Sequence, residues 1–197
     1  MRRLFIVLTL AMPLTGVSAA RGQEMVGVSG SSVEYPSVRE SNIGDKKYLL
    51  KLTGAAMRKK AIFNVYAIGS YVANNFVGRT AEELARVDAV KQLHMVMQRD
   101  VSGRDMARAF QDSIRANYPD QFTEEIKKLT AIMEAQNAEK GDHVWLTYIP
   151  GYGIHVNLVG KKSEFIPGVK FGRAVWEIYL GPKNIGEAVK KGLISRL

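Results

Sequence analysis

The sequence predicts one α+β domain, in which a large antiparallel sheet carries helices on one side. Its predicted strands and helices occur in runs rather than in strict alternation, which favours this class over a parallel α/β fold. The strands show a period of two in their apolar residues, and the helices a period near 3.6. No internal repeat, linker or low-complexity tract divides the 197 residues, so we expect a single domain.

Residues 1–20 have the three parts of a secretory signal peptide. Arg2-Arg3 precedes an apolar stretch at residues 4–14, and Val17-Ser18-Ala19 forms a cleavage site of the small-x-small type. The apolar stretch is too short to span a bilayer, which needs roughly 20 apolar residues. This length argues against the alternatives, an uncleaved anchor or a buried strand. We expect cleavage near Ala19 or Ala20 and a periplasmic or secreted protein with no stable membrane insertion.

Residues 21–32 are rich in glycine and small polar residues and predict a flexible lead-in, so the domain is expected to cover residues 33–197. Its first strands are expected at residues 48–53 and 61–73. Both faces of the second strand are largely apolar, which predicts that it is covered on both sides of the sheet. Further strands are expected at 93–97 and, as a hairpin with a glycine-rich loop, at 144–149 and 154–159.

Five helices are expected, and two have clear start signals. Thr80 is followed three residues later by Glu83, as in a capping box, and Ser102 is followed by Asp105 in the same way. The longer helices carry apolar residues on one face, which predicts packing against the sheet. The expected ranges are a short helix after residue 80, then 102–118, from 123 to a break at 141–142, 169–180 and 185–193.

The formal net charge is +9, and the chain contains no cysteine. A basic balance of this kind suits nucleic acid, anionic lipid or acidic ligands. The basic residues are scattered in pairs and triplets such as Arg58-Lys59-Lys60, however, without the interleaved aromatic residues of single-strand binders. We therefore interpret them as a solvated surface and expect no nucleic-acid partner. The lack of cysteine excludes disulfides and thiol nucleophiles.

Signatures of cofactor, metal and hydrolase sites are absent from the sequence. Gly151-x-Gly153 is followed by Val156 where the dinucleotide fingerprint needs glycine, and no phosphate-binding loop ending in Gly-Lys-Ser or Gly-Lys-Thr occurs. The three histidines, at 94, 143 and 155, lack the spacing of zinc ligands on a helix. No serine lies in a nucleophile elbow. We expect neither a cofactor nor a metal.

One segment carries polar residues that packing alone does not require. Arg58 lies at the end of a predicted strand, and Asn64 and Tyr66 lie in the next strand, where valine or isoleucine would suit a purely structural role. If these strands form a hairpin, a guanidinium and a phenol converge and can bind a carboxylate through three hydrogen bonds. An arginine near a turn is also commonly a surface residue, so the pattern by itself leaves both interpretations open.

The segment Gly54–Val72 resembles the arginine strand and the following strand of the chalcone isomerase family. Phe171–Pro182 and then Ile185–Leu193 resemble its C-terminal helix, the Leu-Gly ending and the final short helix. The resemblance covers about residues 49–197 and is closest to bacterial, exported chalcone isomerase-like proteins. It implies an open-faced β-sandwich, with a large antiparallel sheet backed by helices and a ligand cleft between them.

The resemblance also implies which residues line the cleft. Enzymes of the family use an arginine and a threonine on these strands, a tyrosine and an asparagine on the first long helix, and a threonine or serine near the end of the C-terminal helix. Arg58 matches the arginine, and Tyr66 stands in place of the threonine, as in the fatty-acid-binding branch. Met106, Ser113 and Ile178 occupy the other three positions.

Met106 and Ile178 cannot donate the hydrogen bonds that stabilise phenolate and enolate charge during chalcone closure. We therefore interpret the protein as a non-catalytic binder of a small apolar carboxylate, such as a fatty acid. One alternative is an isomerase or intramolecular lyase that uses Arg58 as electrophile and Tyr66 as acid. The other is an envelope interaction protein with a vestigial cleft. The sequence does not indicate the oligomeric state.

Overall fold

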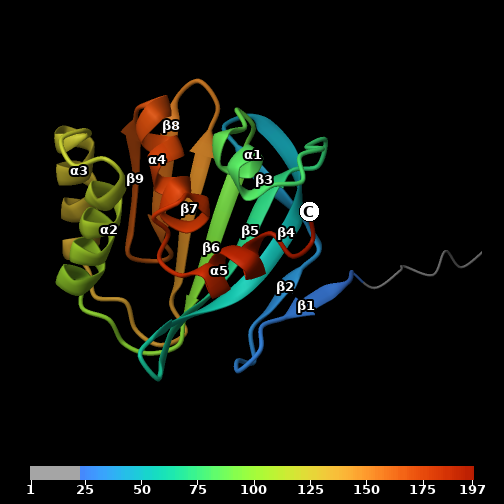
Figure 1. Cartoon of the computed structure of the whole chain (residues 1–197), viewed down its shortest axis with the longest axis horizontal. Coiled ribbons are helices and arrows are strands. Elements are labelled where there is room, and N and C mark those ends of the chain that lie inside the picture. Colours follow the sequence, from blue (N-terminus) through green and yellow to red (C-terminus); the bar gives the residue numbers. More distant parts are fainter. Residues whose placement is uncertain (1–22) are drawn as a thin grey trace, which may run out of the picture.

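The computed structural model describes residues 23–197, and the predicted signal peptide at residues 1–20 lies outside that range. Seven antiparallel strands form the main sheet, in the order β3-β4-β5-β6-β7-β8-β9, so that each strand pairs with its neighbours in sequence. Five helices lie on one side of this sheet (Figure 1). The predicted α+β class, an antiparallel sheet backed by helices, is confirmed. Within the described range, no helix has the length and apolarity that a membrane span requires.

The elements follow the expected order, with additional short strands. The strands are β1 (Met25–Gly27), β2 (Glu34–Pro36), β3 (Val38–Ile43), β4 (Lys46–Lys60), β5 (Phe63–Ala73), β6 (Lys91–Met97), β7 (His143–Ile149), β8 (Gly153–Leu158) and β9 (Lys162–Pro167). The helices are α1 (Ala81–Arg86), α2 (Gly103–Asn117), α3 (Thr123–Glu134), α4 (Val169–Leu180) and α5 (Glu187–Leu193). Thr80 and Ser102 cap α1 and α2 as predicted, each accepting a hydrogen bond from the backbone N–H three residues later.

The helices pack on one face of the sheet to form the main core. Ile68 of β5, Leu93 of β6 and Leu146 of β7 are fully buried there, together with Trp176 of α4 and Ile114 of α2. Each such side chain contributes roughly 1.5–3 kcal/mol relative to an exposed position. The central strands and the helices are therefore held by the same apolar layer.

The hairpin of β4 and β5 reaches beyond the sheet to one end of the helical layer. Its turn contains Ala61 with a φ of +52°, and its register places Arg58 directly opposite Tyr66. Gly54 lets α5 lie against the strand, because a Cβ there would come within 2.1 Å of the carbonyl oxygen of Gly192. The hydroxyl of Thr53 also donates a hydrogen bond to the Leu193 carbonyl, at 2.8 Å. These contacts fix the end of the chain beside the hairpin.

The outer face of the sheet is partly covered by the β1–β2 ribbon, so the predicted flexible lead-in at residues 21–32 is wrong from Met25 onward. The ribbon is anchored by Tyr35, which is fully buried and whose ring lies over Gly69. A Cβ on Gly69 would approach that ring to 2.8 Å. The hydroxyl of Tyr35 donates to the carbonyl of His94 at 3.1 Å, and Val28 is also buried. Two anchoring side chains therefore order a segment whose composition is that of a loop.

The strand predicted at 61–73 is covered on both sides, as its two apolar faces indicated. Ile68 and Val72 belong to the core under the helices, whereas Ala67 and Tyr71 pack on the side of the β1–β2 ribbon. The third helix is shorter than predicted. It ends at Glu134, because the chain then turns back so that Ala138 pairs with Val101.

Candidate ligand-binding site

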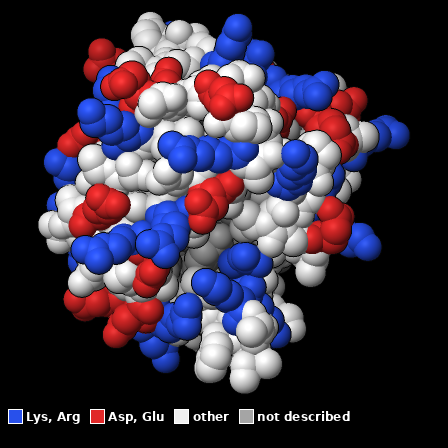
Figure 2. Space-filling view, turned by 60° about the vertical axis from the view of Figure 1, so that its left-hand side comes forward, with Lys and Arg blue, Asp and Glu red and all other residues white. Residues whose placement is uncertain are grey.

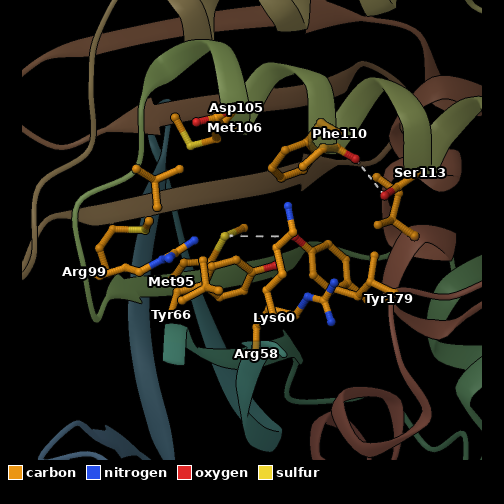
Figure 3. Close-up of a pocket in the computed structure, with 16 residues that line it drawn as sticks. Arg58, Lys60, Tyr66, Met95, Arg99, Asp105, Met106, Phe110, Ser113 and Tyr179 are labelled. Atoms are coloured by element: carbon orange, nitrogen blue, oxygen red, sulfur yellow. Dashed lines mark hydrogen bonds between the residues drawn. The ribbon is translucent and has the colours of Figure 1, made fainter. Parts of the chain in front are cut away.

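A cavity of about 130 Å³ lies between the sheet and the helices, at the end of the β4–β5 hairpin. Arg58, Lys60 and Tyr66 contribute from the sheet and face Met106 and Phe110 of α2 across the cavity (Figure 3). The walls are mostly apolar. They include Val65, Met95, Met97, Val101, Met106, Ala109, Phe110, Ile178 and Ile185.

The structure brings together five of the six residues singled out from the sequence. Arg58, Tyr66, Met106, Ser113 and Ile178 all line this cavity, although they come from β4, β5, α2 and α4. All five of these positions were matched to the family's functional residues through the resemblance, so their convergence in one cavity supports that alignment.

Asn64 does not line the cavity, and its prediction as a ligand-binding residue is not supported by the geometry. A register irregularity between Arg58 and Lys59 places Asn64 opposite Lys59 rather than in line with Tyr66. The side-chain amide of Asn64 donates instead to the carbonyl of Gly30, at 3.1 Å. Its polarity therefore serves the contact between β5 and the loop of the β1–β2 ribbon.

Arg58 and Tyr66 form the polar end of the cavity. Arg58 is half-buried, and its Nη1 donates to the carbonyl of Lys59 at 2.9 Å, which holds the guanidinium close to the turn. Its other four N–H groups make no hydrogen bond within residues 23–197 and are available to a ligand. Tyr66 lies beside it on the neighbouring strand and is also half-buried.

Both tyrosines of the cavity are neutral at neutral pH. Burial raises the pKa of Tyr66, an effect that the interaction with Tyr179 and the positive charge of Arg58 only partly oppose. Burial also raises the pKa of Tyr179 well above its ordinary value, and the interaction with Tyr66 raises it further. The hydroxyl of Tyr179 is directed at the sulfur of Met95, at 3.9 Å. Tyr66 can therefore donate a hydrogen bond to an anion but does not act as a base at this pH.

The helical side of the cavity offers little further hydrogen bonding. The hydroxyl of Ser113 donates to the carbonyl of Ala109 in the preceding turn of α2, at 2.7 Å. Met106, Phe110 and Ile178 are buried and apolar. Methionine fills irregular space and adapts to different neighbours, so this wall can accommodate an alkyl chain of variable shape.

The cavity residues that the sequence did not reveal include Lys60, Arg99 and Tyr179. Lys60 and Arg99 are exposed at its edge, and Tyr179 lies deep within it (Figure 3). The triplet Arg58-Lys59-Lys60 was interpreted as solvated surface, because nothing local distinguishes a basic residue beside a cavity from any other. Asp105 is the single acidic residue of the lining, and it already accepts a hydrogen bond from Ser102 at 2.7 Å. The positive charges therefore outnumber the negative ones, which favours an anionic ligand.

Metal chemistry finds no support in the described residues. No group of three or more His, Cys, Asp or Glu side chains among residues 23–197 is arranged to hold a metal ion.

On the face of the molecule shown in Figure 2, lysine and arginine are intermingled with aspartate and glutamate. That face thus has a mixed charge rather than one continuous basic patch.

These features agree with comparisons to known proteins. Residues 35–195 match a family model described as chalcone isomerase-like. The protein therefore belongs to the chalcone isomerase-like family. Its fold is similar to the crystal structure of a fatty-acid binding protein from Arabidopsis thaliana, with a TM-score of 0.67 and 18% sequence identity over 87% of this chain and 96% of that chain. A sequence search of curated proteins finds no significant match.

Proposed function

We propose that the protein binds a small apolar carboxylate, such as a fatty acid, without transforming it. The observation that carries this proposal is the composition of the cavity, which has a guanidinium and a neutral phenol at one end and apolar walls elsewhere. A carboxylate accepts hydrogen bonds from both polar groups, whereas an alkyl chain gains free energy by leaving water. The fatty-acid binding described for the Arabidopsis protein of similar fold supports the same ligand class.

The shift in the pKa of Tyr66 argues against the enzymatic alternative. A tyrosine that acts as general acid or base works best when its pKa lies near the operating pH. Burial raises the pKa of Tyr66 and so moves it further from neutral pH. Met106 and Ile178 provide no hydrogen bond to a developing oxyanion, and Ser113 is engaged within its own helix.

The cavity also argues against a vestigial cleft filled by its own side chains. A vestigial cleft would be closed and would exclude Arg58, but here Arg58 lines an open space together with Tyr66. The space of about 130 Å³ is smaller than the roughly 300–1,000 Å³ of typical ligand sites. We therefore expect short and medium alkyl chains to fit the observed conformation, and longer chains to require movement of the methionine side chains.

A calorimetric titration with hexanoate, octanoate and decanoate tests the proposal. Each added methylene is worth about 0.8 kcal/mol when it is buried, so affinity should rise about four-fold per methylene until the cavity is full. The matched control is 1-decanol, which keeps the chain and lacks the carboxylate, and it should bind at least ten-fold more weakly. Equal affinity for decanol and decanoate would show that the polar end does not recognise a carboxylate.

The proposed location of this activity is outside the cytoplasm. The motivation is the arrangement of Arg2-Arg3, the apolar stretch and Val17-Ser18-Ala19. N-terminal sequencing of the protein from cell fractions should find a chain that starts at Ala20 or Arg21. An intact Met1 in a cytosolic fraction would contradict the proposal without affecting the assignment of the ligand.

A further inference from the structure

A second cavity lies on the opposite face of the sheet. Along β6, β7 and β8, alternate residues such as Leu93, Leu146 and Val156 belong to the core under the helices. Their neighbours Gln92, Trp145 and Asn157 therefore point to the outer face, because successive side chains of a strand alternate. Together with residues of β3 they line a cavity of about 390 Å³, within the usual range for small-molecule sites.

The floor of this outer cavity is organised by Trp145. The guanidinium carbon of Arg39 lies 3.9 Å from the centre of its ring. The His94 ring also stacks on it, at 3.5 Å with an angle of 10° between the planes. His94 is itself held by a hydrogen bond to His143 at 2.8 Å. Arg39 of β3 is thus held against Trp145 of β7, which His94 of β6 also contacts.

Arg39 has no counter-charge among the described residues. It is half-buried, none of the ion pairs within residues 23–197 includes it, and its Nε is buried without a hydrogen-bond partner. No aspartate or glutamate lines the cavity. A half-buried cation without a partner is unfavourable, and an arginine remains charged at any physiological pH. A bound anion would remove this imbalance.

Gln92 provides a second sign of incomplete bonding. Its side chain is only 5% exposed, and its amide nitrogen donates to Ser41 at 2.8 Å and to Thr147 at 3.1 Å. Its Oε1 is buried and has no partner among the described residues. Buried polar atoms are nearly always hydrogen-bonded, so the unpaired atoms on Arg39 and Gln92 leave this wall of the cavity with unmet hydrogen-bonding capacity.

The remaining polar residues of the outer cavity are neutral. Thr147 and Asn157 carry no charge, and burial lowers the pKa of His155, which keeps its ring neutral at neutral pH. Such groups donate and accept hydrogen bonds, as the hydroxyl groups of a ligand require. Ile43 and Ile149 add apolar surface, but an alkyl chain would still bury the polar groups of Thr147, His155 and Asn157, so a hydrophilic ligand suits this cavity better than a fatty acid.

The geometry points to a second binding site here, which takes a hydrophilic carboxylate of monosaccharide size. Its carboxylate lies on Arg39, and its hydroxyl groups bond to Thr147, His155 and Asn157. This site is separated from the apolar cavity by the sheet and does not depend on the function proposed for that cavity. Its two requirements, one negative charge and several hydroxyl groups, define the ligand class.

The test is an NMR titration of the purified protein with sodium D-glucuronate. The chain has two tryptophans, and Trp176 is fully buried on the helical side of the sheet, so its indole N–H signal is an internal reference. The Trp145 indole signal should shift in a saturable way with D-glucuronate, and D-glucose, which lacks the carboxylate, should bind at least ten-fold more weakly. Arg39→Gln should weaken the binding of glucuronate about ten-fold or more.

The matched control variant is Arg58→Gln, which removes the same charge from the other cavity. It should leave glucuronate binding unchanged and weaken decanoate binding, whereas Arg39→Gln should do the reverse. Arg39→Lys, which keeps the charge but loses the planar stack, should restore only part of the affinity. The proposal is wrong if glucuronate leaves the Trp145 signal unchanged, if glucose binds equally well, or if folded Arg39→Gln protein retains full affinity.

Discussion

Arg58 should be the main determinant of affinity for an apolar carboxylate. One of its five N–H groups donates to Lys59, and the others are available to an anion in the cavity. A hydrogen bond to a charged group contributes about 1.5–3 kcal/mol, and partial exposure of Arg58 places its effect near the lower end. Arg58→Gln should therefore weaken the binding of decanoate about ten-fold to thirty-fold, as measured by titration calorimetry.

The neighbouring residues provide matched comparisons for this variant. Lys59→Gln removes the same charge one position away, outside the cavity lining, and should leave the affinity unchanged. Tyr66→Phe removes a neutral donor, worth about 0.5–1.5 kcal/mol, and should weaken binding about two-fold to ten-fold. Arg58→Lys should recover only part of the loss, because an ammonium lacks the planar fork of a guanidinium. Equal losses in Lys59→Gln and Arg58→Gln would refute the carboxylate receptor and leave only a general charge effect.

Three further outcomes are expected. Burial lowers the pKa of Lys91 to about 7, so between pH 7 and 10.5 the folded state binds fewer protons than the unfolded state. The free energy of unfolding should therefore rise with pH in this range, by up to about 1.4 kcal/mol per pH unit. Urea titrations at several pH values should show this rise for the unmodified protein and not for Lys91→Met. Gly192→Ala would bring a Cβ to 2.7 Å from that of Ala56, and it should lower the stability by about 1–3 kcal/mol, whereas Gly27→Ala meets nothing within 4 Å and should be nearly neutral. A spectrophotometric assay should find no chalcone cyclisation above the uncatalysed rate, since Met106 and Ile178 offer no oxyanion support; saturable turnover lost in Arg58→Ala would contradict this.

Much of the fold was predictable because its signals are local. The caps at Thr80 and Ser102 depend on residues three positions apart, and both helices begin where these signals indicated. The alternating pattern of residues 61–73 predicted a strand covered on both sides, which is what the core residues of β5 confirm. Edge strands β3 and β9 were missed because they are short and largely polar or exposed, so periodicity does not distinguish them from loops.

The places of Asn64 and Tyr179 relative to the candidate site could be known only from the tertiary structure. Asn64 lies outside the cavity because a one-residue irregularity beside Arg58 changes which residue of β5 stands opposite which residue of β4. Tyr179 was missed because its importance comes from meeting Tyr66, which lies far away in the sequence. In a helix rich in buried apolar residues, no local signal separates a tyrosine beside a cavity from one in the core.

The sequence alone determined the class of the fold and the family to which the chain belongs. These features reside in contiguous segments whose spacing is set by the backbone. Tertiary structure alone decided which residues enclose the outer cavity. The cluster of Arg39, Trp145 and His94 joins β3, β7 and β6, and such a cluster exists only once the sheet has aligned the three strands.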